Sequence, residues 1–256
     1  MSPEMQRALQ QQSYFVQEDV PNGLLEEMLE HFLGTTDFEN FEDFKKNRSN
    51  TGRITNWDSC KPLDWFLGYL EENLGDRYFI VQIGFPFLRG SKTGTGVHFD
   101  RTQSIFDSSG EGIVQCWIPI WEQNMPDSGL RLYPRFVDGE QVYDDDTYGA
   151  YHRTRMIKGR LGAKRFDIPV EADIPEPVDF GVRDNLGKII WFNSNCLHGT
   201  LKKDNADFDE DQSRIALAIR FVRKGCSLRP GFTLQDLRNI TTENDPYRLE
   251  IEQRYF

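Results

Sequence analysis

The sequence predicts an antiparallel β-sandwich or jelly roll that is mainly β and is supported by helices on its N-terminal side. Two observations predict this class. Helical periodicity is found in the first part of the chain, before residue 77. From Arg77 onward, short runs rich in β-branched and aromatic residues alternate with turns rich in Gly, Asp and Ser. Helices followed by many short strands favour a layered β fold, because each sheet must bury one face.

The length and composition indicate one large domain with a packed core. The chain has 256 residues, of which 38% are hydrophobic and 13% aromatic, values typical of a globular protein. We expect a helical support over residues 1–76, a jelly-roll core over 77–223 and a C-terminal extension over 224–256. The extension either covers the barrel or joins two copies, so a monomer and a homodimer both stay open.

Helix signals occur at three places in the support. Ser2 followed by Pro3 is typical of a helix start. A second helix is predicted by apolar residues at helical spacing, followed by Gly34 as a stop, at Leu24, Leu25, Met28, Leu29 and Phe32. His31 lies within it and is expected to be a structural or exposed histidine rather than a metal ligand. A further amphipathic helix is predicted from Pro62 to Leu74, closed by Gly75.

Strands are predicted at residues 77–85, 94–100, 113–120, 129–133, 187–194 and 214–222. The segment 138–186 is long for a connection between strands of one domain. Connections of that length in compact domains are often lids or binding loops. We therefore expect a lid-like insertion there.

Charge and cysteine usage exclude several classes of function. The formal net charge of −11 disfavours binding to nucleic acid or to anionic membranes, because both need a basic surface. The scattered cysteines Cys60, Cys116, Cys196 and Cys226 form no zinc or disulfide pattern. There is no apolar signal core and no stretch of transmembrane length. We expect a cytoplasmic protein with reduced thiols.

A metal-binding pattern begins in the predicted strand 94–100. Residues two apart on a strand face the same side, so His98 and Asp100 can contact one ion. His198 follows another predicted strand and supplies a second imidazole. Two histidines and one carboxylate hold Fe(II) while leaving coordination positions open. The pair alone is also consistent with a buried structural histidine followed by a turn aspartate.

Further motifs follow in a fixed order after this pair. They are the strand around Trp117, the turn Ser128-Gly-Leu, the run from Gly187 to His198-Gly-Thr200, and Arg214 on the last core strand. Over residues 77–223 this order resembles the phytanoyl-CoA dioxygenase-like family of Fe(II)- and 2-oxoglutarate-dependent oxygenases.

The resemblance implies a double-stranded β-helix with O₂ and 2-oxoglutarate as cosubstrates. It implies that His98, Asp100 and His198 hold the iron. It also implies that Arg214 pairs with the distal carboxylate of 2-oxoglutarate, a task suited to a planar and permanently charged guanidinium. The other cosubstrate contacts that we expect are Thr200, Trp117 and, more weakly, Gln82. Halogenating relatives lack the carboxylate, so Asp100 favours hydroxylation, desaturation or ring closure.

Three features depart from the family pattern. The loop between His198 and Arg214 is long and acidic, which leaves Arg220 as a rival for the cosubstrate arginine. Arg214 and Arg220 share a face of their strand, and Arg214 is favoured because it opens the strand. The turn after Ser128 continues as Tyr-Pro-Arg in place of the more usual Pro-Gly-Ser-His. Phe99 stands where some relatives carry a polar cosubstrate contact.

Basic residues indicate how a substrate could be recognised. The candidates for contact with a carboxylate or phosphate of a small-molecule substrate are Arg131, Arg135, His152, Arg153 and Arg155. The alternative is a solvated face or a subunit contact that balances nearby acids.

Taken together, the sequence predicts an Fe(II)- and 2-oxoglutarate-dependent hydroxylase of a small polar molecule, such as an amino acid or a biosynthetic intermediate. Two other classes stay open: a metal-dependent jelly-roll enzyme that does not use 2-oxoglutarate, and a non-catalytic β-sandwich binding protein.

Overall fold

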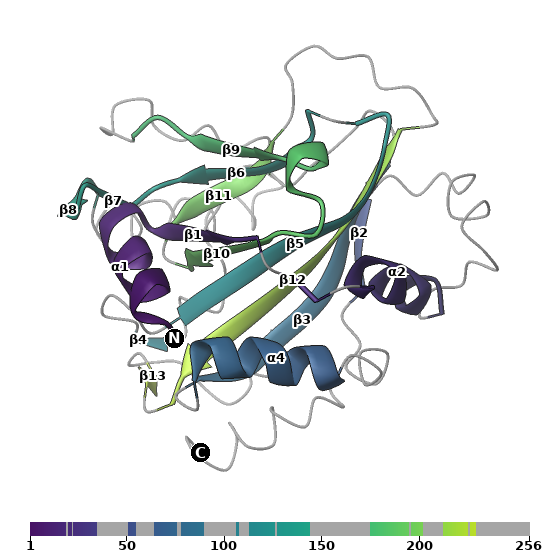
Figure 1. The fold of residues 1–256 in the computed structure, drawn as a ribbon. Coiled ribbons are helices and arrows are strands. Elements are labelled where there is room, and N and C mark those ends of the chain that lie inside the picture. Colours follow the sequence, from purple (N-terminus) through teal and green to yellow (C-terminus); the bar gives the residue numbers. More distant parts are fainter. Residues whose placement is uncertain are drawn as a thin grey trace, which may run out of the picture.

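The computed structural model describes residues 1–18, 20–21, 23–34, 51–54, 64–75, 78–89, 106–107, 113–125, 127–143, 175–194, 196–201, 212–224 and 226–228. Within these residues the chain forms two main antiparallel sheets and three α-helices (Figure 1). None of these helices has the length and apolar composition needed to cross a membrane.

The large sheet has six strands in the order β1-β10-β5-β12-β3-β2. These strands are β1 (Tyr14–Gln17), β10 (Ile189–Asn193), β5 (Ile113–Gln123), β12 (Ser213–Arg223), β3 (Tyr78–Arg89) and β2 (Thr51–Ile54). The small sheet has the order β11-β6-β9. Its strands are β11 (Leu197–Leu201), β6 (Gly129–Tyr133) and β9 (Val178–Gly181). Two short pairs join β4 (Phe106–Asp107) to β13 (Ser227–Leu228), and β7 (Phe136–Val137) to β8 (Glu140–Gln141).

The helices cover one face of the large sheet. They are α1 (Pro3–Gln12), α2 (Leu24–Gly34) and α4 (Asp64–Leu74). The Ser2 hydroxyl accepts a hydrogen bond from the Met5 amide and caps α1, which ends at Ser13 in the left-handed conformation (φ 70°). All three helices start or stop where the sequence predicts, within two residues. Their apolar faces form one core with the large sheet, to which they contribute Met5, Leu9, Leu24, Met28, Phe66, Leu70 and Leu74.

The small sheet packs on the opposite face of the large sheet (Figure 1). A second apolar cluster fills the space between the sheets, formed by Trp117, Leu130, Leu132, Phe180, Val182, Ile190, Phe192, Cys196 and Ala216. Strand alternation separates the two cores. On β12, for example, Ile215 and Leu217 face the helices while Ala216 faces the small sheet. We call the space between the sheets the interior.

An irregularity in β5 changes which of its residues face the interior. Trp117 pairs with Ala218 and Pro119 pairs with Ala216, but Trp121 pairs with Ile215. Ile120 is therefore an extra residue, a β-bulge that shifts the alternation by one. Before the bulge, odd-numbered residues of β5 face the interior; after it, Glu122 does.

Four strands of the two main sheets lie outside the predicted strand ranges: β1, β2, β9 and β11, the last of which begins three residues after the predicted range 187–194. The short strands β4, β7, β8 and β13 also lie outside those ranges. Strands β1 and β2 belong to the segment expected to be a helical support, yet both are edge strands of the large sheet. Strand β9 lies within the range 138–186 expected to be a lid, and it pairs with β6 in the small sheet. Strands β1, β2 and β9 are each only four residues long, which is too short for a clear alternating pattern.

Candidate active site

His198 lies on β11 and faces the interior. It is buried, it pairs with Leu132 across the small sheet, and its ring contacts the ring of Phe192 edge to face at 5.2 Å between centroids. Its Nδ1 lies 3.0 Å from the carbonyl oxygen of Cys196. A carbonyl only accepts, so Nδ1 carries the hydrogen and the lone pair is on Nε2. A metal-binding histidine typically has this arrangement, in which its second nitrogen fixes the tautomer.

Tyr143 joins the two strands beside His198. Its hydroxyl donates to the carbonyl oxygen of Tyr133 at 2.7 Å and accepts from the amide of Leu197 at 3.1 Å. Tyr133 and Leu197 face each other in the register of β6 and β11, so the hydroxyl takes the place of a direct ladder bond. Burial raises the pKa of Tyr143 well above its usual range, which keeps the hydroxyl protonated. Tyr143 therefore fixes the start of β11 one residue before His198.

Arg214 connects the large sheet to the small one. Its Nε donates to the Ser128 hydroxyl at 2.8 Å, and its Nη2 donates to the Thr200 hydroxyl at 3.4 Å. The Ser128 hydroxyl in turn lies 3.5 Å from the carbonyl oxygen of Leu201. Arg214 is 5% exposed, and burial lowers its pKa to about 10. Among the described residues, no carboxylate forms an ion pair with it.

Arg220 lies on the same face of β12 but farther along the strand. Its Nε donates to Oε1 of Gln115 at 3.3 Å. Six residues of strand separate it from Arg214, a distance of about 20 Å at the usual rise. Both arginines are buried in the interior, as strand alternation predicts. Arg214 contacts Thr200, two residues after His198, whereas the described contact of Arg220 is with Gln115. The choice between them at the cosubstrate position stays a prediction.

Trp117 also faces the interior, where it is buried between the two sheets. Gln82 pairs with Arg220 across β3 and β12, and its side chain lies outside the described part of the structure. His98, Asp100, His152, Arg153 and Arg155 lie outside the described residues altogether, so their expected roles stay predictions. No group of three potential metal ligands occurs within the described residues.

Two of the basic residues expected to bind substrate have other surroundings. Arg131 stands between the inward-facing Leu130 and Leu132, so it lies on the outer face of the small sheet. There it forms a two-bond ion pair with Asp179, with both N–O distances at 2.8 Å. The expected contact of Arg131 with substrate stays a prediction. Arg135 is buried near Tyr143 and Cys196, behind the start of β11.

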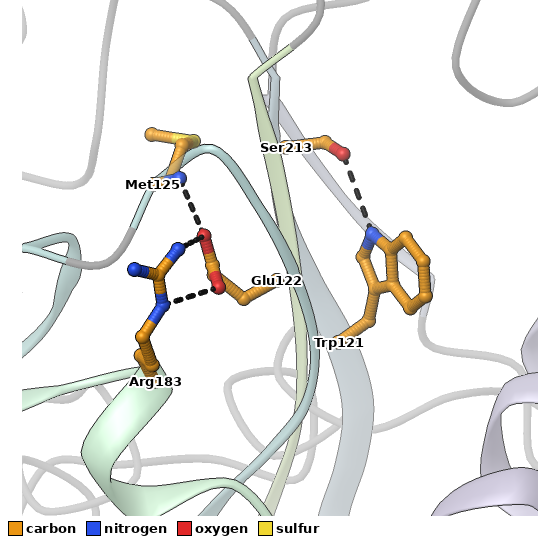
Figure 2. A network of polar contacts seen from close by, with 5 residues as sticks. All are labelled: Trp121, Glu122, Met125, Arg183 and Ser213. Atoms are coloured by element: carbon orange, nitrogen blue, oxygen red, sulfur yellow. Dashed lines mark hydrogen bonds and ion pairs between the residues drawn. The ribbon is translucent and has the colours of Figure 1, made fainter.

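Glu122 is the residue directly across from Arg214 in the register of β5 and β12. Its carboxylate is nevertheless bound by Arg183, from the 3₁₀-helix η2 (Arg183–Asn185), at 3.0 and 3.1 Å. The amide of Met125 donates to the same carboxylate at 2.7 Å. Figure 2 shows Glu122 and Trp121 on opposite sides of β5, with Trp121 donating to the hydroxyl of Ser213.

Three contributors to the site were missed by sequence reasoning. Ser128 lies in the Ser-Gly-Leu turn of the family pattern, and its place in that motif is the signal that could have identified it as a contact of Arg214. Tyr143 and Glu122 act through residues far away in the sequence, and no local pattern marks them.

Comparisons with known proteins define the fold. No protein-family model and no curated protein match the sequence. Solved structures do match over most of the chain. One is SnoK, a non-haem, alpha-ketoglutarate-dependent carbocyclase from nogalamycin biosynthesis, with 14% identity, 94% of this chain and 92% of SnoK covered, and a TM-score of 0.57. Another is SnoN, an epimerase from the same biosynthesis, with 13% identity, coverage of 93% and 86%, and a TM-score of 0.57.

A third match is HygX from Streptomyces hygroscopicus, in a structure with nickel and 2-oxoglutarate bound. It has 13% identity, coverage of 88% of both chains and a TM-score of 0.54. At such identities the likeness defines the architecture and leaves the chemistry to the residues themselves. The two packed antiparallel sheets with flanking helices confirm the predicted fold: the chain is a double-stranded β-helix, the fold of SnoK, SnoN and HygX.

Proposed function

We propose that this protein is a non-haem Fe(II)- and 2-oxoglutarate-dependent oxygenase that hydroxylates an unactivated C–H bond of a small polar molecule, with release of succinate and CO₂. The observation that carries the proposal is Arg214. It is a buried guanidinium whose hydrogen bonds within the described residues go to two hydroxyls. A buried charge without a counter-ion is costly, and a carboxylate ligand would supply the counter-ion.

The spacing of the interior residues suits a five-carbon dicarboxylate. Thr200 lies two residues after His198 on one strand, a separation of roughly 7 Å. Arg214 contacts Thr200. A 2-oxoglutarate with its distal carboxylate on Arg214 would therefore reach the surroundings of His198 with its keto acid end. Trp117 is buried among apolar residues of the same interior.

We propose His98, Asp100 and His198 as the iron ligands. The tautomer of His198 fits this role, because Nδ1 donates to Cys196 and the lone pair of Nε2 is the one able to bind a metal. When bound, iron and 2-oxoglutarate supply the oxidising power by reaction with O₂. The chain's own residues bind and orient: His198 is held by Cys196 and Phe192, and Arg214 with Thr200 and Ser128 holds the dicarboxylate.

The substrate is proposed to be a small molecule, in line with the enzymes from nogalamycin biosynthesis that share the fold. Those enzymes are an epimerase and a carbocyclase, so the fold supports more than one type of reaction. The proposed carboxylate ligand Asp100, present in the sequence, argues against halogenation and is consistent with hydroxylation, desaturation or ring closure, of which we propose hydroxylation.

Anaerobic addition of Fe(II) and 2-oxoglutarate is expected to produce the weak visible charge-transfer band of a keto acid bound to iron. The band should vanish in His98→Ala, because a ligand is lost. If the wild-type protein gives no band, and forms no succinate when O₂ is admitted, the proposal fails. Turnover of a substrate without 2-oxoglutarate, and unchanged in Arg214→Ala, would instead favour a metal-dependent jelly-roll enzyme that does not use 2-oxoglutarate. Absence of Fe(II) binding would favour a binding protein.

Tyr143→Phe is expected to weaken Fe(II) binding by about tenfold, the size typical of losing a group that orients a ligand. Without the hydroxyl, the Leu197 amide and the Tyr133 carbonyl either form a direct hydrogen bond or lose their partner. Either change shifts the backbone at the start of β11 and therefore the position of His198. Calorimetric Fe(II) titration under anaerobic conditions measures the change. Tyr69→Phe is the matched control, because Tyr69 lies on α4 and packs on the helix-covered side of the large sheet, and its hydroxyl likewise accepts a hydrogen bond, from Gln17. Equal Fe(II) affinity of wild type and Tyr143→Phe would contradict the expectation.

A further inference from the structure

Glu122 and Arg214 face each other across two neighbouring strands. They are register partners on β5 and β12, and the Cβ atoms of such partners are about 5 Å apart. Side chains directly opposite in an antiparallel pair point to the same face. The β-bulge at Ile120 is what turns Glu122 to this face, since it shifts the alternation of β5. The fold therefore places a carboxylate beside the arginine that we propose binds 2-oxoglutarate.

This carboxylate is held by another cation. Both of its oxygens accept hydrogen bonds from Arg183, and Oε1 also accepts from the Met125 amide (Figure 2). The Glu122 side chain is 6% exposed, whereas that of Arg183 is 55% exposed. An exposed side chain thus reaches in from η2 to bind a buried carboxylate. Arg214 meanwhile donates to Ser128 and Thr200.

We propose that Arg183 is a positioning residue that holds Glu122 away from Arg214 and so keeps Arg214 available for the distal carboxylate of 2-oxoglutarate. This inference rests on the proposed function. A buried carboxylate that loses its partner cation is strongly destabilised, so it will pair with another cation if one is within reach. Arg214 is the cation directly across the strand pair. An internal Glu122–Arg214 pair would occupy the guanidinium fork and compete with the cosubstrate for it.

The mechanism predicts a specific double-variant pattern in 2-oxoglutarate affinity. In Arg183→Ala the released Glu122 pairs with Arg214, and the dissociation constant of 2-oxoglutarate should rise about tenfold to a hundredfold, the usual range for coupling between two competing interactions. In the double variant Arg183→Ala/Glu122→Gln the competing charge is gone, and the affinity should return to within about threefold of that of Glu122→Gln alone.

Two readouts measure the pattern. One is anaerobic titration of the Fe(II) protein with 2-oxoglutarate. The other uses metal-free protein and measures how far 2-oxoglutarate raises the Tm, since a ligand stabilises the state that binds it. Arg131→Ala is the matched control, because it breaks a two-bond arginine–carboxylate pair on the outer face of the small sheet. Its affinity for 2-oxoglutarate should equal that of wild type.

The outcomes separate the inference from the proposed function. Failure of the wild-type protein to bind 2-oxoglutarate overturns both. Normal affinity in Arg183→Ala overturns the inference alone. Weak binding in Arg183→Ala that Glu122→Gln does not restore also overturns it, because the loss is then structural. Restoration by Glu122→Gln supports it, since a merely structural role for Arg183 would not be relieved by removing the charge of its partner.

Discussion

His198→Ala is expected to abolish turnover and to weaken Fe(II) binding by more than about 100-fold, because losing a group that only orients a ligand already costs up to that much. The variant removes one of three proposed iron ligands. It also removes the hydrogen bond to Cys196 and the ring contact with Phe192. Anaerobic Fe(II) titration and succinate formation measure the two effects separately.

The fold should survive this change. The lost hydrogen bond and ring contact are each worth about 1 kcal/mol, which is small beside the stability of a typical domain. Thermal unfolding of the metal-free variant checks this. His31→Ala is the matched control, since His31 lies on α2, which packs on the far side of the large sheet. Normal Fe(II) affinity in His198→Ala would remove His198 from the ligand set, whatever happened to the activity.

Much of the fold could be predicted from the sequence because its central strands are long and apolar. Strands β5, β6, β10 and β12 lie where the sequence places them, within three residues. Each is buried on one or both faces, so each carries a strong run of β-branched and aromatic residues. Strands β1 and β2 are at the edges of the large sheet, where packing constrains the sequence on fewer sides and the signal is weak.

The site was predictable to the extent that strand alternation determines it. Alternation places Arg214 and Arg220 on one face, and the structure confirms this. The same rule places Arg131 on the outer face of the small sheet, because it stands between Leu130 and Leu132, which face the interior. What alternation cannot supply is tertiary pairing. The bulge at Ile120 reverses the facing of Glu122, and the contact with Arg183 spans 61 residues. No local pattern encodes either one.

Arg214→Met is expected to reduce the affinity for 2-oxoglutarate by about 100-fold or more, the cost of removing one partner of a buried charged pair. Methionine keeps much of the length and apolar volume of the side chain but has no donors. Iron binding should be retained, because Arg214 is not a proposed ligand. Titration of the anaerobic Fe(II) variant with 2-oxoglutarate measures the loss, and the concentration of 2-oxoglutarate that half-saturates turnover should rise in parallel.

The same variant should be at least as stable as wild type in the absence of ligand. Burial lowers the pKa of Arg214 to about 10, so the charged form is disfavoured by folding at neutral pH, by roughly 3 kcal/mol. Removing the charge relieves this cost. The loss of the hydrogen bonds to Ser128 and Thr200 costs about 1 kcal/mol each, which offsets part of this gain in the free energy of unfolding. Because the pKa of Arg214 is lowered in the folded protein, the wild type begins to regain this stability only as the pH rises above about 10, and the gain is complete only near the higher pKa of the unfolded chain.

Arg220→Met is the control that shows whether the loss of 2-oxoglutarate affinity in Arg214→Met is specific to Arg214. Arg220 is also a buried arginine on the interior face of β12, with Gln115 as a hydrogen-bond partner. A general effect of removing interior charge would weaken 2-oxoglutarate binding equally in both variants. If Arg214 binds the distal carboxylate, its variant must show the larger loss. The reverse order would assign the cosubstrate to Arg220. It would also remove the basis for the role of Arg183, since Arg183 acts only on the carboxylate across from Arg214.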